Sequence, residues 1–205
     1  MSQTPLRRRF LPTLAMAGLL AVGVSGCTLN FNGFGTSNMM GSGTSMMAGA
    51  GNYSTTDLMF AAMMIPHHQQ AVEMSELALK VSSNADVRAL AQQIKDAQQP
   101  EIDQMKSWLA GSAYEAMATS MPGMDHGMMD GMLSEEQISA LAAATGVDFD
   151  KLFLQGMILH HQGAIAMASM VTSSSNAEAK ALGDAIVKSQ TAEIETMQQL
   201  LTSLG

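Results

Sequence analysis

The chain is organised around Met64-Ile65-Pro66-His67-His68-Gln69-Gln70-Ala71-Val72-Glu73-Met74 and a second copy, Met157-Ile158-Leu159-His160-His161-Gln162-Gly163-Ala164-Ile165-Ala166-Met167. Four of the five histidines in the protein lie in these two copies. On a 3.6-residue period, both histidines of each pair fall on or beside an apolar stripe. A neutral imidazole buried on such a face needs a hydrogen-bond or metal partner.

The two copies predict two helical hairpins. The first repeat (residues 57–110) would hold one helix from a cap near Thr56-Asp57 to Val81 and another from Asp86 to Leu109, ended by Gly111. The second repeat (residues 148–204) would hold a helix from Asp148 or Asp150 to Thr172 and a last helix to Leu204. Neither hairpin buries its apolar face alone, so the sequence predicts an all-α fold, an antiparallel four-helix bundle.

A methionine-rich bridge (residues 111–147) joins the repeats. Its residues 121–132 contain three glycines and His126 together with Met121, Met124, Met128, Met129 and Met132, a composition that does not suit a core helix. Ser134 to Gln137 resembles a capping box, which predicts a short extra helix to Ala144, closed by Gly146. Pro66 and Pro100 lie inside predicted helices and should kink them.

The first residues read as an export signal. Arg7, Arg8 and Arg9 precede an apolar run, and Val24-Ser25-Gly26-Cys27 resembles the lipobox of bacterial lipoproteins, in which the cysteine is lipidated. We therefore expect a signal peptide over residues 1–27, with lipidation at Cys27. A flexible tether rich in Gly, Ser and Met over residues 28–55 and one bundle domain over residues 56–205 would follow. This predicts a lipoprotein held by its lipid anchor on the periplasmic or extracellular side of a bacterial envelope.

Composition excludes several partners and ligands. Losing the three leader arginines leaves 7 of the 10 basic residues against 18 acidic ones, a net charge of −11. A chain this acidic is a poor nucleic-acid binder and suits cations better. Cys27 is the only cysteine, so any metal must be held by nitrogen, oxygen or thioether ligands.

The repeated motifs also resemble a known family. Met-Ile-x-His-His-Gln-x-Ala-[Val/Ile]-x-Met occurs twice, Gln98-x-x-Glu101-Ile102-x-x-Met105 matches Gln190-x-x-Glu193-Ile194-x-x-Met197, and the bridge opens with Met-Pro-Gly-Met. Together they resemble the domain-of-unknown-function family numbered 305 over about residues 55–205. The resemblance implies a ferritin-like four-helix bundle in an exported bacterial protein. Some members of that family are linked to periplasmic copper binding, so the resemblance also implies a copper role.

Helical spacing and antiparallel packing bring the candidate metal ligands to one level of the bundle. Imidazoles, carboxylates and thioethers of both repeats take part, with the bridge as a possible auxiliary site. The candidate ligands are His67, His68, His160, His161, Met64, Met157, Met74, Met167, Glu101, Glu193, Met105 and Met197; the auxiliary ones are His126, Met121, Met124, Met128, Met129 and Met132.

The ligand types help to choose the metal. Ferritin-like di-iron sites place a glutamate three residues before a histidine. Here Met64 and Met157 stand at that position before His67 and His160. Thioether and imidazole ligands favour copper, especially Cu(I), whereas zinc or iron would rely on the histidines and glutamates.

Other interpretations of the residues stay open. The protein could be a di-metal ferritin-like oxidoreductase, although no nucleophilic triad, phosphate-binding glycine loop or dinucleotide motif is present. Alternatively, buried His–Glu pairs could serve a structural or interaction module that binds no metal. Glu73 has Ala166 as its counterpart and is expected to be a solvated helix residue.

Overall fold

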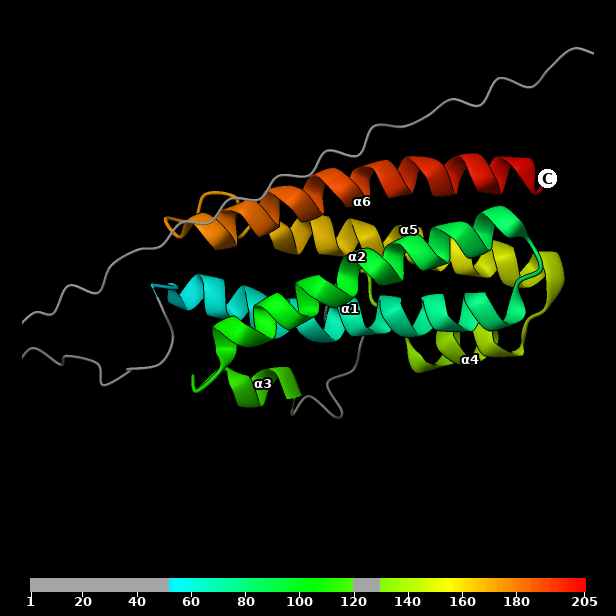
Figure 1. The fold of residues 1–205 in the computed structure, drawn as a ribbon. Coiled ribbons are helices and arrows are strands. Elements are labelled where there is room, and N and C mark those ends of the chain that lie inside the picture. The colour runs from blue at the N-terminus through cyan, green and yellow to red at the C-terminus, as the bar shows by residue number, and fades with distance from the viewer. Residues whose placement is uncertain (1–51, 120–129) are drawn as a thin grey trace, which may run out of the picture. The chain divides into compact units, whose positions relative to one another are not determined.

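The computed structural model of the protein describes residues 52–119 and 130–205, which are helical with connecting turns (Figure 1). Among these residues, no helix combines the length and apolarity that a membrane span requires. The leader, Cys27 and most of the tether lie outside the described residues. So do five of the candidate bridge ligands, namely Met121, Met124, His126, Met128 and Met129.

The first hairpin consists of α1 (Thr55–Val81) and α2 (Ala85–Leu109). α1 starts with a capping box in which the Ser54 hydroxyl accepts from the amide of Asp57, whose carboxylate accepts from the Ser54 amide at 2.7 Å. The cap is thus Ser54, slightly earlier than predicted, because serine supplies the oxygen that Asp57 reciprocates. Both helices continue through their internal prolines, Pro66 and Pro100.

The second hairpin consists of α5 (Gly146–Ala168) and α6 (Ala177–Ser203). The predicted caps at Asp148 and Asp150 are wrong, because α5 already begins at Gly146, whose φ of +59° suits glycine. The predicted end at Thr172 is also wrong. After Ala168 the chain turns, and the Thr172 hydroxyl donates to the carbonyl oxygen of Ser169 at 3.2 Å, which offers the backbone a local alternative to the helix.

The bridge contains two short helices, α3 (Glu115–Thr119) and α4 (Glu135–Ala143). The capping box of α4 is confirmed: the Ser134 side chain accepts from the Gln137 amide, and the Gln137 side chain accepts from the Ser134 amide at 2.8 Å. α3 was not predicted from the sequence. Gly146 opens α5 and so has a different role from the predicted one, which was to close α4.

α1 packs against both α2 and α5, and α5 packs against α6, so the predicted helical bundle of two hairpins is confirmed (Figure 1). Its hydrophobic core is divided into two clusters. One combines the first half of α1 and of α6 with the second half of α2 and of α5, and the other combines the opposite halves with α4. Between the clusters lie polar residues of all four long helices. Eight of them form the set that we call the polar layer: His67, His68, Gln98, Glu101, His160, His161, Gln190 and Glu193.

Candidate metal centre

His67 of α1 and His160 of α5 meet at the centre of the polar layer. Their ring centroids are 3.8 Å apart with 40° between the planes, and neither side chain is exposed. The Nε2 atom of His160 is 2.9 Å from the backbone carbonyl oxygen of His67. The Nε2 atom of His67 lies 3.4 Å from the carbonyl oxygen of Asp130, in the part of the bridge that precedes α4. The two repeats therefore bring their first histidines, which occupy equivalent positions 93 residues apart, together.

The second histidine of each pair contacts a glutamate of its own hairpin. His68 Nε2 is 2.8 Å from Glu101 Oε2, and His161 Nε2 is 2.8 Å from Glu193 Oε2. The other carboxylate oxygen of Glu193 accepts from the side-chain amide of Gln93 at 3.1 Å, which links α2 to α6. The carboxylates thus receive hydrogen bonds from the imidazoles and orient them.

These contacts determine which ring nitrogen carries hydrogen. In all four histidines Nε2 faces a carbonyl or carboxylate oxygen, which can only accept, so Nε2 is the donor. In the neutral ring the lone pair then lies on Nδ1. All four Nδ1 atoms are buried and have no hydrogen-bond partner among the described residues. A ligating histidine commonly donates its other N–H to a carboxylate or carbonyl, and this layer reproduces that arrangement four times.

Burial keeps the central pair neutral. Desolvation, reinforced by the neighbouring His68, lowers the pKa of His67 from 6.5 to about 3. The pKa of His160 is also well below its ordinary value, first because the ring is buried and then because His67 is close. Only the neutral imidazole offers a lone pair to a metal, so both rings are in the ligating form at neutral pH.

The same pKa shifts predict acid sensitivity of the metal-free protein. Below pH 6.5 the unfolded chain takes up protons at His67 and His160 while the folded chain does not, so stability falls as pH falls from 6.5 towards 3. At pH 5.5 each histidine should cost about 1.4 kcal/mol relative to high pH. Urea unfolding at pH 7.5 and 5.5 measures this loss. In the double variant His67→Leu with His160→Leu, the free energy of unfolding should fall much less between these two pH values. An equal fall in the wild type and the variant would contradict the assignment of the acid sensitivity to these two histidines.

Six predicted methionine ligands lie in or beside the two apolar clusters, on either side of the polar layer. Met64 and Met105 belong to the first cluster, against which the half-buried Met167 packs. The equivalent Met157 and Met197 belong to the second cluster, together with Met74. Each repeat therefore contributes thioethers to both sides of the histidines. Met64 and Met157 precede the central histidines by one helical turn on the same face.

Not every predicted ligand joins one cluster. Among residues 52–119 and 130–205, no three side chains of the His, Cys, Asp and Glu types meet in an arrangement that would hold an ion. The central rings are adjacent, whereas the rings within each sequence pair are 6.5 Å and 6.3 Å apart. Met132 is largely buried in the bridge just before α4, and Glu73 is exposed, in agreement with the prediction for it.

Several polar residues of this region were not among the predicted site residues. Gln98 and Gln190 occupy equivalent positions three residues before the glutamates, and both side-chain amides are buried without a partner among the described residues. Their signal was present in the repeated Gln-x-x-Glu motif. Gln70 bonds the backbone of Leu133, and the backbone carbonyl of Asp130 faces the His67 ring, each across 63 residues of sequence. Neither contact gave such a signal, because in each of them one partner is a backbone atom.

Comparisons with known proteins agree with this fold. A crystal structure of a DUF305 fragment from Deinococcus radiodurans aligns with a TM-score of 0.66 and 31% identity over 73% of this chain and 97% of that one. CopM in the Cu(II)-bound form aligns with a TM-score of 0.62 and 36% identity over 73% and 97% of the chains. CopM in the Cu(I)-bound form has a TM-score of 0.58 and 34% identity over 73% and 98%.

A search of curated proteins gives no match. The family comparison, however, covers most of the bundle. The sequence model described as "Domain of unknown function (DUF305)" matches residues 57–201, from the first turn of α1 nearly to the end of α6. Both hairpins, the bridge and every residue of the polar layer fall inside the matched range. The chain therefore belongs to the DUF305 family.

Proposed function

We propose that this protein binds and handles copper ions, taking Cu(I) between the central histidines and the flanking thioethers. The observation that carries the proposal is the set of four buried Nδ1 atoms without partners, each on a ring whose Nε2 already donates to an oxygen. A purely structural histidine would be expected to satisfy both ring nitrogens when fully buried.

The donor types favour copper over harder metals. His67 and His160 supply two adjacent neutral imidazoles, and Met64 and Met157 supply buried thioethers one helical turn away. Soft sulfur and imidazole ligands select Cu(I), whereas iron and manganese sites rely on carboxylates. Glu101 and Glu193 hold the outer imidazoles through hydrogen bonds, so they act in this proposal by orienting His68 and His161 rather than as ligands.

The comparisons support the same class of ligand. CopM, about one-third identical to this chain, has been solved in Cu(II)-bound, Cu(I)-bound and silver-bound forms. Silver(I) is also a soft ion that favours sulfur and nitrogen ligands. The leader sequence adds an expected location, because lipidation at Cys27 would keep an exported copper-binding protein at the membrane.

Metal binding by the purified mature protein tests the proposal. We expect Cu(I) and Ag(I), added anaerobically to the metal-free protein, to bind and to raise the thermal unfolding temperature. Mg²⁺ and Mn²⁺ should give little or no increase. A structural or interaction module would show no selective stabilisation by the soft ions, and that result would count against the proposal. Oxidase activity of the copper-loaded protein would instead support the di-metal oxidoreductase interpretation.

Replacing Met64 and Met157 together by leucine separates thioether ligation from packing. Leucine nearly conserves the volume of methionine, so the metal-free stability should change by less than about 1.5 kcal/mol. Cu(I) affinity, measured by competition with a chromophoric chelator, should weaken because both sulfur ligands are gone. Met59→Leu with Met170→Leu is the matched control, since both residues are exposed and outside the polar layer. Equal affinities in the two double variants would remove Met64 and Met157 from the proposed site.

A further inference from the structure

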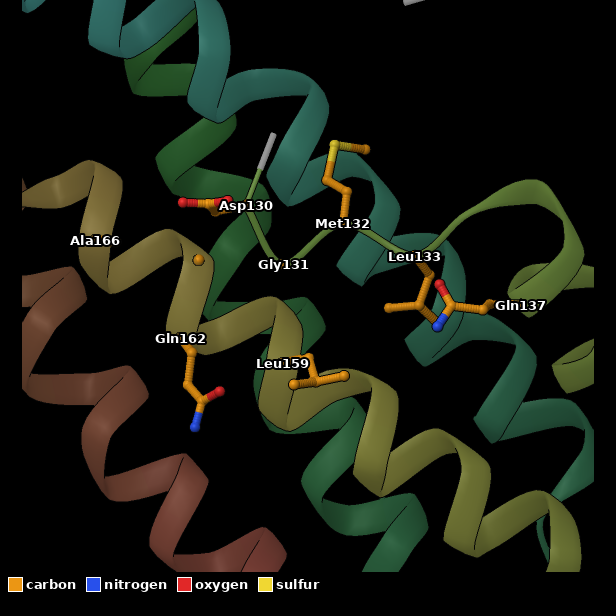
Figure 2. Close-up of a pocket in the computed structure, with 9 residues that line it drawn as sticks. Asp130, Gly131, Met132, Leu133, Gln137, Leu159, Gln162 and Ala166 are labelled. Carbon is orange, nitrogen blue, oxygen red and sulfur yellow. The ribbon is translucent and has the colours of Figure 1, made fainter. Parts of the chain in front are cut away.

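The part of the bridge that precedes α4 lies between the two histidine helices. Residues 130–133, which we call the crossing segment, run between α1 and α5 beside Leu159 and Gln162 (Figure 2). The carbonyl oxygen of Asp130, at its start, is the acceptor that faces Nε2 of His67 at 3.4 Å. The position of the crossing segment therefore determines whether Nε2 of His67 faces a hydrogen-bond acceptor.

On the α1 side, one side chain binds the crossing segment at two points. The Gln70 amide donates to the carbonyl oxygen of Leu133 at 2.9 Å, and its oxygen accepts from the Leu133 amide at 2.8 Å. Both bonds are buried. Gln70 thus satisfies both backbone groups of one residue, which fixes the segment in position and in direction along α1.

On the α5 side, the crossing segment lies directly against the helix backbone, because Gly163 has no side chain. A Cβ atom on Gly163 would lie 1.7 Å from the Asp130 carbonyl oxygen and 2.9 Å from Cα of Gly131. Gly131 has a φ of +89°, and a Cβ there would lie 2.4 Å from the Leu159 carbonyl oxygen. Backbone therefore touches backbone at this crossing. Next to it the segment and α5 border a hollow of about 420 Å³, so bulky side chains do not fix the segment on this side.

Gln70 and Gly163 are equivalent positions of the two repeats, 93 residues apart, and each follows its central histidine by three residues. Residues three apart share a helix face, so the two contacts lie on the faces that carry His67 and His160. One repeat thus bonds the crossing segment and the other makes room for it. The central histidines consequently differ: His160 donates to the backbone of α1, whereas His67 faces the crossing segment.

We propose that Gln70 and Gly163 are positioning residues, which hold the Asp130 carbonyl against the His67 ring. The ring of His67 then keeps its hydrogen on Nε2 and its lone pair on Nδ1. The inference rests on the proposed function for its consequence, because a copper ion between the central histidines would then meet the Nδ1 atom of His67. Its structural part, the choice of tautomer, concerns the metal-free protein alone.

Nitrogen-15 NMR of the metal-free protein tests the choice of tautomer directly. We expect the His67 ring of the wild type to carry its hydrogen on Nε2. In Gln70→Leu, which cannot bond Leu133, we expect a mixture of tautomers and Cu(I) binding roughly 10- to 100-fold weaker, the usual range for loss of an orienting group. Gln69→Leu changes the neighbouring glutamine in the same way and should leave the tautomer and the affinity as in the wild type.

Two further variants keep the test decisive if Gln70→Leu does not fold. Gln70→Glu retains the acceptor for the Leu133 amide but turns its second oxygen towards the Leu133 carbonyl oxygen, so its effect should have the same direction as that of Gln70→Leu. Gly163→Ala should shift the tautomer as well, although alanine favours helix, because its Cβ would displace Asp130. Hydrogen on Nδ1 of His67 in the wild type, or an unchanged tautomer in the folded Gln70 and Gly163 variants, would overturn the inference. Failure of the wild type to bind Cu(I) would overturn the proposed function instead, since the NMR readout needs no metal.

Discussion

His67→Leu combined with His160→Leu is expected to abolish the stabilisation that Cu(I) gives to the wild type. A metal that binds only the folded state stabilises it by about 2.7 kcal/mol at a hundredfold excess over Kd. For a chain of this size that corresponds to roughly 5–11 °C in the unfolding temperature. Both substitutions remove a buried Nδ1 atom from the only adjacent ring pair among the described histidines, so the increase should disappear. Differential scanning calorimetry with and without anaerobic Cu(I) measures it.

The metal-free proteins supply the control for this experiment. Leucine cannot donate to the Asp130 and His67 backbone carbonyls, and each buried acceptor left without its donor costs about 1–3 kcal/mol. The double variant is therefore expected to unfold at a lower temperature even without copper. What identifies ligation is the difference between metal-free and copper-loaded samples of one variant. If this difference matches that of the wild type, the histidine pair is not the binding site, and the methionines of the bridge would become the remaining candidates.

The second large effect is expected at Glu193. Its two carboxylate oxygens accept from His161 and Gln93, and its side chain is only 6% exposed. Glu193→Leu leaves the His161 Nε2–H buried without an acceptor, which should cost about 1–3 kcal/mol in the free energy of unfolding. Loss of an orienting carboxylate should also weaken Cu(I) binding by roughly 10- to 100-fold. Urea unfolding and chelator competition measure the two effects separately.

The equivalent glutamate of the first hairpin is the matched comparison. Glu101 contacts His68 at the same 2.8 Å, but its side chain is 18% exposed, so solvent more readily replaces the lost bond. Glu101→Leu should therefore cost less stability than Glu193→Leu. Glu193→Gln should recover much of the loss, because its amide oxygen still accepts from His161, while the exposed Gln93 can turn to present its own oxygen. If Glu101→Leu lowered the free energy of unfolding more than Glu193→Leu, the cost of losing each glutamate would not follow from its burial.

The sequence predicted the hairpins well because their signals are local and periodic. The apolar stripe through Phe60, Met64 and Ala71 indicated a helix face, and the 93-residue repeat indicated that two such faces would pack together. The ends were predicted less well. Thr172 has a side chain that bonds a nearby carbonyl, and Gly146 tolerates a positive φ, so both alter helix boundaries by means that hydrophobic spacing does not register.

For the candidate site, the sequence indicated which residues could take part but gave them no individual roles. Helical spacing brought Glu101 to the level of His67 and His68, and the contact between Glu101 and His68 agrees with this. It did not pair His67 with His160, whose adjacency comes from the packing of α1 against α5. It could not show that Nε2 of each of these four rings faces an oxygen, the observation on which we base the proposed ligation at Nδ1 and the proposed orienting role of the glutamates. It also could not reveal the contact between Asp130 and His67, because a backbone carbonyl has no residue type from which a motif could be recognised.

The unequal pair at positions 70 and 163 limits how freely the two hairpins can be exchanged. A symmetric dimer of the first hairpin could still assemble four histidines and two glutamates, but glutamine would stand at both crossing points. The second glutamine would occupy the space that Gly163 leaves for Asp130. A dimer of the second hairpin would have room at both points and no amide to bond Leu133. Because the two hairpins are joined in one chain, equivalent positions can carry different residues. An assembly of identical halves would carry the same residue at both positions.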